Sequence, residues 1–276
     1  MIRALLSLLV LSLAAPTVLA KEAPVELRGE WCQGHLLRGQ AAPGATAHLN
    51  GKPLRVSPEG AFVFGFGRDE AESQHLLVHL PGDQVWERSD VPCSREYQIQ
   101  RIDGLPPSKV TPDPKALKRI REEAAQAAAA RTFDIDDSAV FDDFVWPSRG
   151  PISGVYGSQR ILNGEPRNPH FGVDVAAPTG TEVVAPVAGI VRMAHPDMYF
   201  SGGTLIMDHG HGVTSSFLHL SKIVVKEGQR VEQGQKIAEI GATGRVTGPH
   251  LDWRMNWFGV RVDPQPLAGP MPAAKP

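Results

Sequence analysis

Two short segments in the second half of the chain combine histidine and aspartate at spacings that suit a metal ion. His170 and Asp174 stand four positions apart, and His250 and Asp252 stand two apart. In a strand, alternate side chains point to the same face, so each pair would share a face. Imidazole nitrogen and carboxylate oxygen both ligate zinc, and a hydrolytic zinc site keeps one position open for water. Singly each segment is a weak signal, but together they predict one divalent-cation site that joins two strands.

The residues around these polar positions favour strands. Valines alternate with glycine and aspartate after His170, and polar and apolar residues alternate completely over residues 250–257. His219 stands alone between two leucines at the end of a predicted strand. Strands are also expected at residues 181–186, 189–194, 203–208, 212–218, 223–226 and 235–240. Residues 144–265 therefore read as a second all-β domain.

The first third of the chain reads as a separate, small β-sandwich-like module over residues 21–102. Asn50-Gly51 is a strong two-residue hairpin signal between two short strands. The module holds both cysteines, and an oxidising compartment would favour a disulfide between Cys32 and Cys93. A linker and helix follow over residues 103–143, with four prolines in residues 103–114 and helix-forming residues in 115–131. A proline-rich tail over residues 266–276 is expected to be disordered.

Composition and the amino terminus place the protein outside the cytoplasm. Residues 1–20 read as a signal peptide, with an early arginine, a leucine-rich run and small residues before the expected cleavage after Ala20. The 28 lysines and arginines are balanced by 30 aspartates and glutamates, which argues against a general nucleic-acid binder. After the signal peptide no apolar run is long enough for stable membrane insertion. We expect a periplasmic or otherwise exported protein.

The same residues lie within a longer stretch that resembles the lysostaphin-type (LytM-type) zinc metallopeptidases, which cut peptide bonds in bacterial peptidoglycan. The resemblance covers residues 146–264, through the segments WPSRGPISGVYGSQR, HFGVDVAAPTGTEVVAPVAGIV and GGTLIMDHGHGVTSSFLHLSKIVVKEGQRVEQGQKIAEIGATGRVTGPHLDW. It implies the antiparallel β fold of that family (the duplicated hybrid motif), one Zn²⁺ per chain, and endopeptidase action on the peptide stems of peptidoglycan. It also implies that His170 and Asp174 are zinc ligands and that His219 and His250 are catalytic histidines.

The chain departs from this family at one position. The family motif ends in His-x-His, whose second histidine is the third zinc ligand, whereas this chain has Asp252. Aspartate is a competent ligand, but a second carboxylate makes the cation a weaker Lewis acid and suits a harder metal such as manganese. The alternative function is therefore a degenerate domain of the same fold that binds cell wall or activates an amidase without cutting.

Five other residues in this half of the chain are weaker candidates for the site, and one other class of protein is disfavoured. His209 and His211 resemble a ligand pair but are expected to be structural. Arg160, Asn163 and Tyr199 could line the narrow substrate groove that the family resemblance implies. A biotinyl or lipoyl carrier domain is disfavoured, because its hairpin-tip lysine has no counterpart here.

Overall fold

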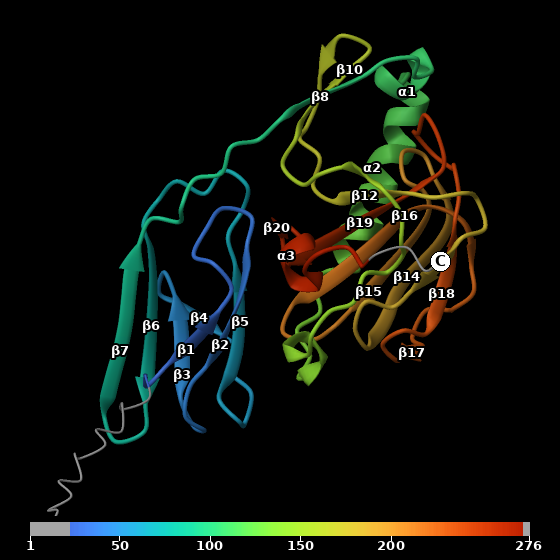
Figure 1. Cartoon of the computed structure of the whole chain (residues 1–276). Coiled ribbons are helices and arrows are strands. Elements are labelled where there is room, and N and C mark those ends of the chain that lie inside the picture. Colours follow the sequence, from blue (N-terminus) through green and yellow to red (C-terminus); the bar gives the residue numbers. More distant parts are fainter. Residues whose placement is uncertain (1–22, 273–276) are drawn as a thin grey trace, which may run out of the picture.

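Strands dominate the computed structural model, which describes residues 23–272 (Figure 1). The mostly-β fold expected from the sequence is confirmed. The signal peptide predicted for residues 1–20 lies outside the described residues. Among the residues described, no helix is long and apolar enough to cross a membrane.

The amino-terminal strands form two small antiparallel sheets. Asn50 and Gly51 both have positive φ, 52° and 75°, as the predicted two-residue turn requires. The predicted disulfide joins Cys32 to Cys93. The first sheet has the order β1-β2-β5 and the second β4-β3-β6-β7, from β1 (Glu26–Arg28), β2 (Leu36–Gln40), β3 (Thr46–Leu49), β4 (Lys52–Leu54), β5 (Ala61–Gly65), β6 (Gln74–Leu80) and β7 (Gln84–Asp90).

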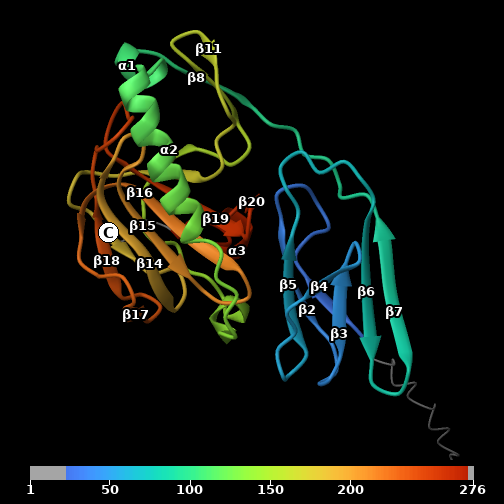
Figure 2. The same cartoon turned by 180° about the vertical axis from the view of Figure 1, so that it is seen from behind.

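A segment with little strand content leads from these sheets to the second half of the chain. It contains β8 (Ile99–Ile102), α1 (Pro107–Val110), α2 (Pro114–Ala129) and a 3-10 helix, η1 (Ser138–Phe141). Asp113 caps α2 by accepting a hydrogen bond from the amide of Ala116, at 2.7 Å. The carboxyl end of α2 packs on strands β14 and β15 of the large sheet through Ala127 and Ala130. Figure 2 shows α2 lying along that sheet.

The second half of the chain is built on one large, bent sheet. Its main order is β17-β14-β15-β16-β19-β12-β9; β18 pairs with β16 and β13, and β20 pairs with β19. Its buried face carries the larger core, centred on Phe217, Trp253 and Met255. The strands are β9 (Ile152–Gly154), β12 (Val173–Ala176), β13 (Glu182–Val184), β14 (Gly189–Met198), β15 (Gly202–Asp208), β16 (Val213–Ile223), β17 (Arg230–Val231), β18 (Lys236–Ile240), β19 (His250–Trp257) and β20 (Val260–Val262).

A third small sheet ties the two parts of the chain together. It has the order β11-β10-β8, from β10 (Gln159–Leu162) and β11 (Glu165–Pro166), and β8 runs parallel to β10. A partly buried ion pair of 2.9 Å between Arg95 and Asp263 adds a second link. Residues 99–110 are thereby held against the large sheet, although they precede it by about fifty residues in the sequence.

The carboxyl-terminal segment is partly regular. Its start forms a short helix, α3 (Gln265–Ala268), although disorder was expected from residue 266. The carbonyl of Gly269 accepts a 3.0 Å hydrogen bond from Trp146 Nε1. This anchored stretch therefore differs from the expectation, because its apolar residues pack against the larger core.

Candidate metal centre

Strands β12 and β19 lie side by side and antiparallel, and their register brings the two aspartates together. Asp174 is directly opposite Asp252. The predicted alternation is present in β19, where Leu251, Trp253 and Met255 are buried in the core behind the site. The core residues thus fix which face of each strand carries the carboxylates.

His170 reaches the same place from outside the strand. It was expected to begin a strand with Asp174, but β12 begins only at Val173. The backbone of His170 bonds instead to the loop before β10, where its amide donates to Ser158 and its carbonyl accepts from Gly157. Its ring is completely buried.

Side-chain atoms of these three residues converge on one point. His170 Nε2 lies 3.1 Å from Asp174 Oδ1 and 3.4 Å from Asp252 Oδ2. One ligand atom from each of the three residues lies within 4.8 Å of the others. The structure therefore brings together the three residues predicted as ligands.

The potential ligand atoms of the cluster would be satisfied better by a cation than by one another. Both ring nitrogens of His170 and Oδ1 of Asp174 are buried without a hydrogen-bond partner in residues 23–272. Leaving a buried polar atom unsatisfied costs about 1–3 kcal/mol. One imidazole and two carboxylates, buried and convergent, supply nitrogen and oxygen ligands of the types zinc takes.

Two arginines bond to the carboxylates of the cluster. Arg160 Nη2 is 3.0 Å from Asp174 Oδ2. Arg254 contacts both oxygens of Asp252, with Nε 2.9 Å from Oδ1 and Nη2 2.5 Å from Oδ2. Asp252 is thus shared between the cluster and a bidentate arginine.

Burial and charge set the ionisation of the cluster. Burial tends to raise the pKa of Asp252, but Arg254 and His170 outweigh it and hold that pKa well below its usual value. Burial also acts to raise the pKa of Asp174, yet His170 and Arg160 leave it lowered. Both carboxylates are therefore ionised and ready to bind a cation. Burial lowers the pKa of His170, but the two aspartates leave it raised overall.

Glycines clear the space that the carboxylates occupy. A Cβ on Gly172 would lie 2.5 Å from Asp252 Oδ1 and 2.7 Å from the carbonyl oxygen of Trp253. A Cβ on Gly154, in β9, would lie within contact distance of Asp174 Oδ2 and 2.9 Å from its Cγ. The cluster is thus closed on two sides by backbone.

His219 lies where β16 changes partner. Strand β16 pairs with β19 up to Leu218 and with β18 from Leu220, and the register with β15 shifts at the same place. His219 has φ of 66°, a left-handed conformation that is uncommon outside glycine and is found at functional sites. This bulge turns its ring toward His250, with ring centroids 4.8 Å apart.

Both of these histidines present the same nitrogen to the cleft. Nδ1 of His219 is 2.8 Å from the carbonyl oxygen of Thr243, and Nδ1 of His250 is 2.9 Å from that of Gly248. A carbonyl only accepts, so Nδ1 of each ring carries a proton, and in a neutral ring Nε2 is then the nitrogen with the lone pair. Burial lowers the pKa of His219 to about 4, so it is neutral at neutral pH.

The segment around β8 walls the cleft and was not predicted to do so. A cavity of about 140 Å³ is lined by Asp174, His219 and His250 on one side and by Gln100, Ile102 and Leu105 on the other. Gln100 Oε1 accepts a 3.2 Å hydrogen bond from Arg160 Nε. No sequence motif marks these residues, because a parallel pairing across some sixty positions leaves no local pattern. The role of Arg254 was also missed, although the alternation of β19 places it on the face of Asp252.

The remaining residues singled out in the sequence fall in different places. Arg160 lies in the site, as described. Asn163 bonds the backbone of Leu105, and the hydroxyl of Tyr199 donates to Ser108, so both contact the segment that walls the cleft. His209 is buried, with its ring nitrogens bonded to Ala188 and Ser215, as a structural residue would be. His211 is buried beside Asp136.

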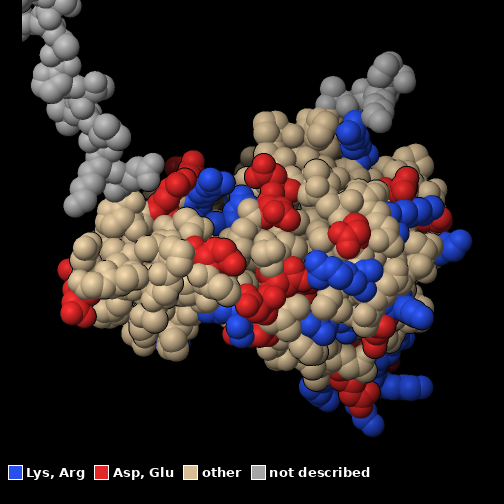
Figure 3. All heavy atoms as spheres, turned by 90° about the horizontal axis from the view of Figure 1, so that it is seen from below, with Lys and Arg blue, Asp and Glu red and all other residues tan. Residues whose placement is uncertain are grey.

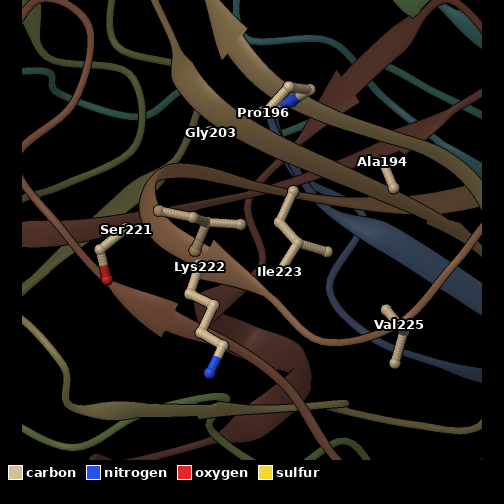
Figure 4. Close-up of a pocket in the computed structure, with 8 residues that line it drawn as sticks. Ala194, Pro196, Gly203, Ser221, Lys222, Ile223 and Val225 are labelled. Atoms are coloured by element: carbon tan, nitrogen blue, oxygen red, sulfur yellow. The ribbon is translucent and has the colours of Figure 1, made fainter.

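A separate cavity lies on another part of the sheet (Figure 4). It measures about 300 Å³ and is lined by Ala194, Pro196, Gly203, Leu220, Ser221, Lys222, Ile223 and Val225. None of the candidate ligands or catalytic histidines lines it. Its lining offers no constellation of ligating groups comparable to the cluster at β12 and β19.

The glycine at the cluster provides a first test. Gly172→Ala would force Asp252 or the backbone of Trp253 to move, so we expect at least a tenfold loss of Zn²⁺ affinity in a calorimetric titration. Gly67→Ala is the matched control, because a Cβ there meets open space at an ordinary φ. Equal Zn²⁺ affinity in the two variants would contradict this account of the cluster.

The buried His219 provides a second test, in metal-free protein. Its folded pKa of about 4 lies below its ordinary value of 6.5, so the unfolded chain binds this proton more readily. Stability should therefore fall as the pH drops from 6.5 toward 4, by about 3 kcal/mol for this group. His219→Asn tolerates the left-handed backbone but does not titrate, so denaturant unfolding should show a weaker loss in the variant. If the stability of both proteins depends on pH in the same way, the lowered pKa assigned to His219 is wrong.

Comparison with known proteins agrees with this geometry. The model of peptidase family M23 matches residues 168–264. The peptidoglycan DD-endopeptidase ShyA of Vibrio cholerae is 42% identical over 110 residues, 39% of this chain and 25% of that protein. The cell division protein DipM of Caulobacter vibrioides is 30% identical over 148 residues, 54% of this chain and 23% of that protein. The chain thus matches about a quarter of the length of these curated relatives.

One solved structure resembles the chain over almost its whole length. A Pseudomonas aeruginosa protein assigned to peptidase M23 is 31% identical, with a TM-score of 0.66, and the match covers 87% of this chain and 96% of that one. The resemblance to lysostaphin-type peptidases is confirmed. This similarity and the match to the family model show that the chain belongs to peptidase family M23.

Proposed function

We propose that this chain is an exported, zinc-dependent endopeptidase that hydrolyses peptide crosslinks of bacterial peptidoglycan. The observation that carries the proposal is the convergence of His170, Asp174 and Asp252 beside two histidines whose free nitrogens face the same cleft. Relatives that are peptidoglycan DD-endopeptidases support the substrate class. The proposal includes the domain organisation expected from the sequence. It comprises a signal peptide over residues 1–20, a module over 21–102, a linker and helix over 103–143, and a peptidase domain over 144–265.

His170, Asp174 and Asp252 would hold the zinc ion. When bound there, zinc would polarise a scissile carbonyl and make a water molecule more acidic. Arg160 and Arg254 keep the two carboxylates ionised and oriented, as groups around metal ligands do. Asp174 can serve as a ligand through Oδ1 while its Oδ2 stays bonded to Arg160. Asp252 would have to share Oδ2 between the cation and Arg254.

His250 is our candidate for the group that moves the proton. Its Nε2 is 3.9 Å from Asp174 Oδ1, and its side chain is more exposed than that of any of the three ligands. It would accept a proton from the attacking water at Nε2 and return it to the leaving amine. The deeper His219 resists protonation, so we assign it to accept a hydrogen bond as a neutral ring and orient the reacting groups.

A specific observation favours a second candidate function. Arg254 engages both oxygens of Asp252, which would weaken a metal ligand at that position. A chain that failed to bind zinc there could still bind cell wall, or activate an amidase, through the same cleft. The two candidate functions differ in one measurable outcome, because only the endopeptidase releases peptides from cell wall.

The deciding experiment uses the purified mature chain and isolated peptidoglycan sacculi. We expect uncrosslinked peptides, identified by mass spectrometry, whose release stops with a chelator and returns with Zn²⁺. His250→Ala should lower the rate by about 10²–10⁴, because a positioned acid–base group contributes that much. His79→Ala, at an exposed position of β6, is the matched control and should act as wild type. Binding to sacculi without any release would reject catalysis in favour of the second candidate.

A further inference from the structure

A second cavity adjoins the cleft, and arginines line it. It measures about 370 Å³, and His219, Ser201, Phe171 and Phe200 are among the residues that line it. Five arginines line it: Arg160, Arg167, Arg245, Arg254 and Arg261. Among the described residues that line it, every charged one is an arginine. We call this cavity the arginine groove.

The five arginines come from distant parts of the sequence. Arg160 is in β10, Arg254 in β19 and Arg261 in β20, while Arg167 and Arg245 lie in loops. The fold therefore gathers like charges that repel one another. Such an arrangement is costly unless an anion offsets it, so the gathering itself points to a ligand.

Three of these arginines lie beside protein carboxylates. Arg160 and Arg254 are paired with Asp174 and Asp252, whose carboxylates belong to the metal cluster. Glu165 lies 3.8 Å from Arg167 and is mostly exposed. A divalent cation at the cluster would draw on the same two aspartates and leave the groove more positive.

Aromatic rings hold two of the other guanidinium groups in place. Arg245 lies over Phe200 and Arg261 over Phe171, each 4.3 Å from the ring centroid. Burial and then neighbouring arginines lower the pKa of Arg245 to about 10, so it stays charged at neutral pH. Stacking on the rings fixes the planes of these two guanidinium groups.

The arginine groove opens onto the reacting groups. His219, Arg160 and Arg245 line both this cavity and the smaller one that holds Asp174 and His250. A peptide with one bond at the catalytic histidines would therefore place a neighbouring residue among the arginines. The charge is local, since the face in Figure 3 carries both signs interspersed and the whole chain has a net charge of −2.

We propose that the arginine groove binds carboxylate groups of the peptide substrate, so that this chain selects anionic peptides. Arg167, Arg245 and Arg261 are the specificity-determining residues, because Arg160 and Arg254 already serve the metal ligands. The proposal rests on the proposed function, in that the same cleft receives a peptide. Arginine suits this role because its planar fork matches a carboxylate in two parallel hydrogen bonds.

The carboxylate could be the main-chain terminus of a peptide or an acidic side chain, and the test separates the two. Acetyl-Ala-Glu-Ala-Ala is titrated calorimetrically into the full-length His250→Ala chain loaded with Zn²⁺. Two relatives follow, the carboxy-terminal amide and the analogue with glutamine in place of glutamate. We expect the free acid to bind about tenfold more tightly than the analogue lacking its recognised carboxylate, as for a hydrogen bond to a charged group. Added salt should reduce this difference.

Variants of the groove complete the test. Arg245→Gln, Arg167→Gln and Arg261→Gln should each reduce the preference for the free acid several-fold, and Arg245→Lys should restore part of it. Arg28→Gln, at an exposed position of β1, is the matched control and should change nothing.

Equal affinity for acid, amide and glutamine peptides, or binding of none of them, would overturn the proposal. The peptide comparison needs no arginine variant, so it stands even if a variant fails to fold. It also needs no hydrolysis. A preference for acids in a chain that never cleaves sacculi would reject the proposed catalysis alone.

Discussion

The structure of the site depends on two buried aspartates that face each other across β12 and β19. Like charges directly opposite in a sheet are destabilising, and burial makes each one costlier. Arg160 holds the outer oxygen of Asp174 and Arg254 holds both oxygens of Asp252, while Asp174 Oδ1 and Asp252 Oδ2 lie toward His170. A cation between those oxygens would complete this balance. The glycines, the loop that carries His170 and the β16 bulge are consistent with the geometry this pair requires.

Packing of the large sheet against the core determines which side chains face the cleft. The apolar face of β19 is anchored in the core, which leaves its polar face no freedom to rotate away from Asp174. Strand β16 pairs on one side of His219 with β19 and on the other with β18, and the bulge at that change directs the ring into the cleft. Residues 99–110, from outside the matched family segment, close the opposite wall.

Local patterns in the sequence predicted the parts of the site that depend on strand periodicity. The alternation of residues 250–257 correctly placed Asp252 and His250 on one face, and the family resemblance correctly identified the fold. The strand expected at His170 was wrong, because its backbone bonds to a distant loop. The wall from β8 depends on pairing with the distant strand β10, which no local pattern encodes. The salt bridge between Arg254 and Asp252 lies within β19, where the alternation places both side chains on one face, but it was not predicted from the sequence. The functional roles of the site residues stay predictions.

The proposed function requires Asp252 to serve as a metal ligand even though Arg254 binds both of its oxygens. The most direct measurement is calorimetric titration of Zn²⁺ into metal-free wild-type, Asp252→Asn and Asp83→Asn chains. Asp83 lies in the exposed turn between β6 and β7, so its variant makes the same chemical change away from the cluster. The account predicts one Zn²⁺ per chain for wild type and Asp83→Asn, and an affinity at least tenfold lower for Asp252→Asn. Equal affinity in all three chains, or no binding by wild type, would contradict it.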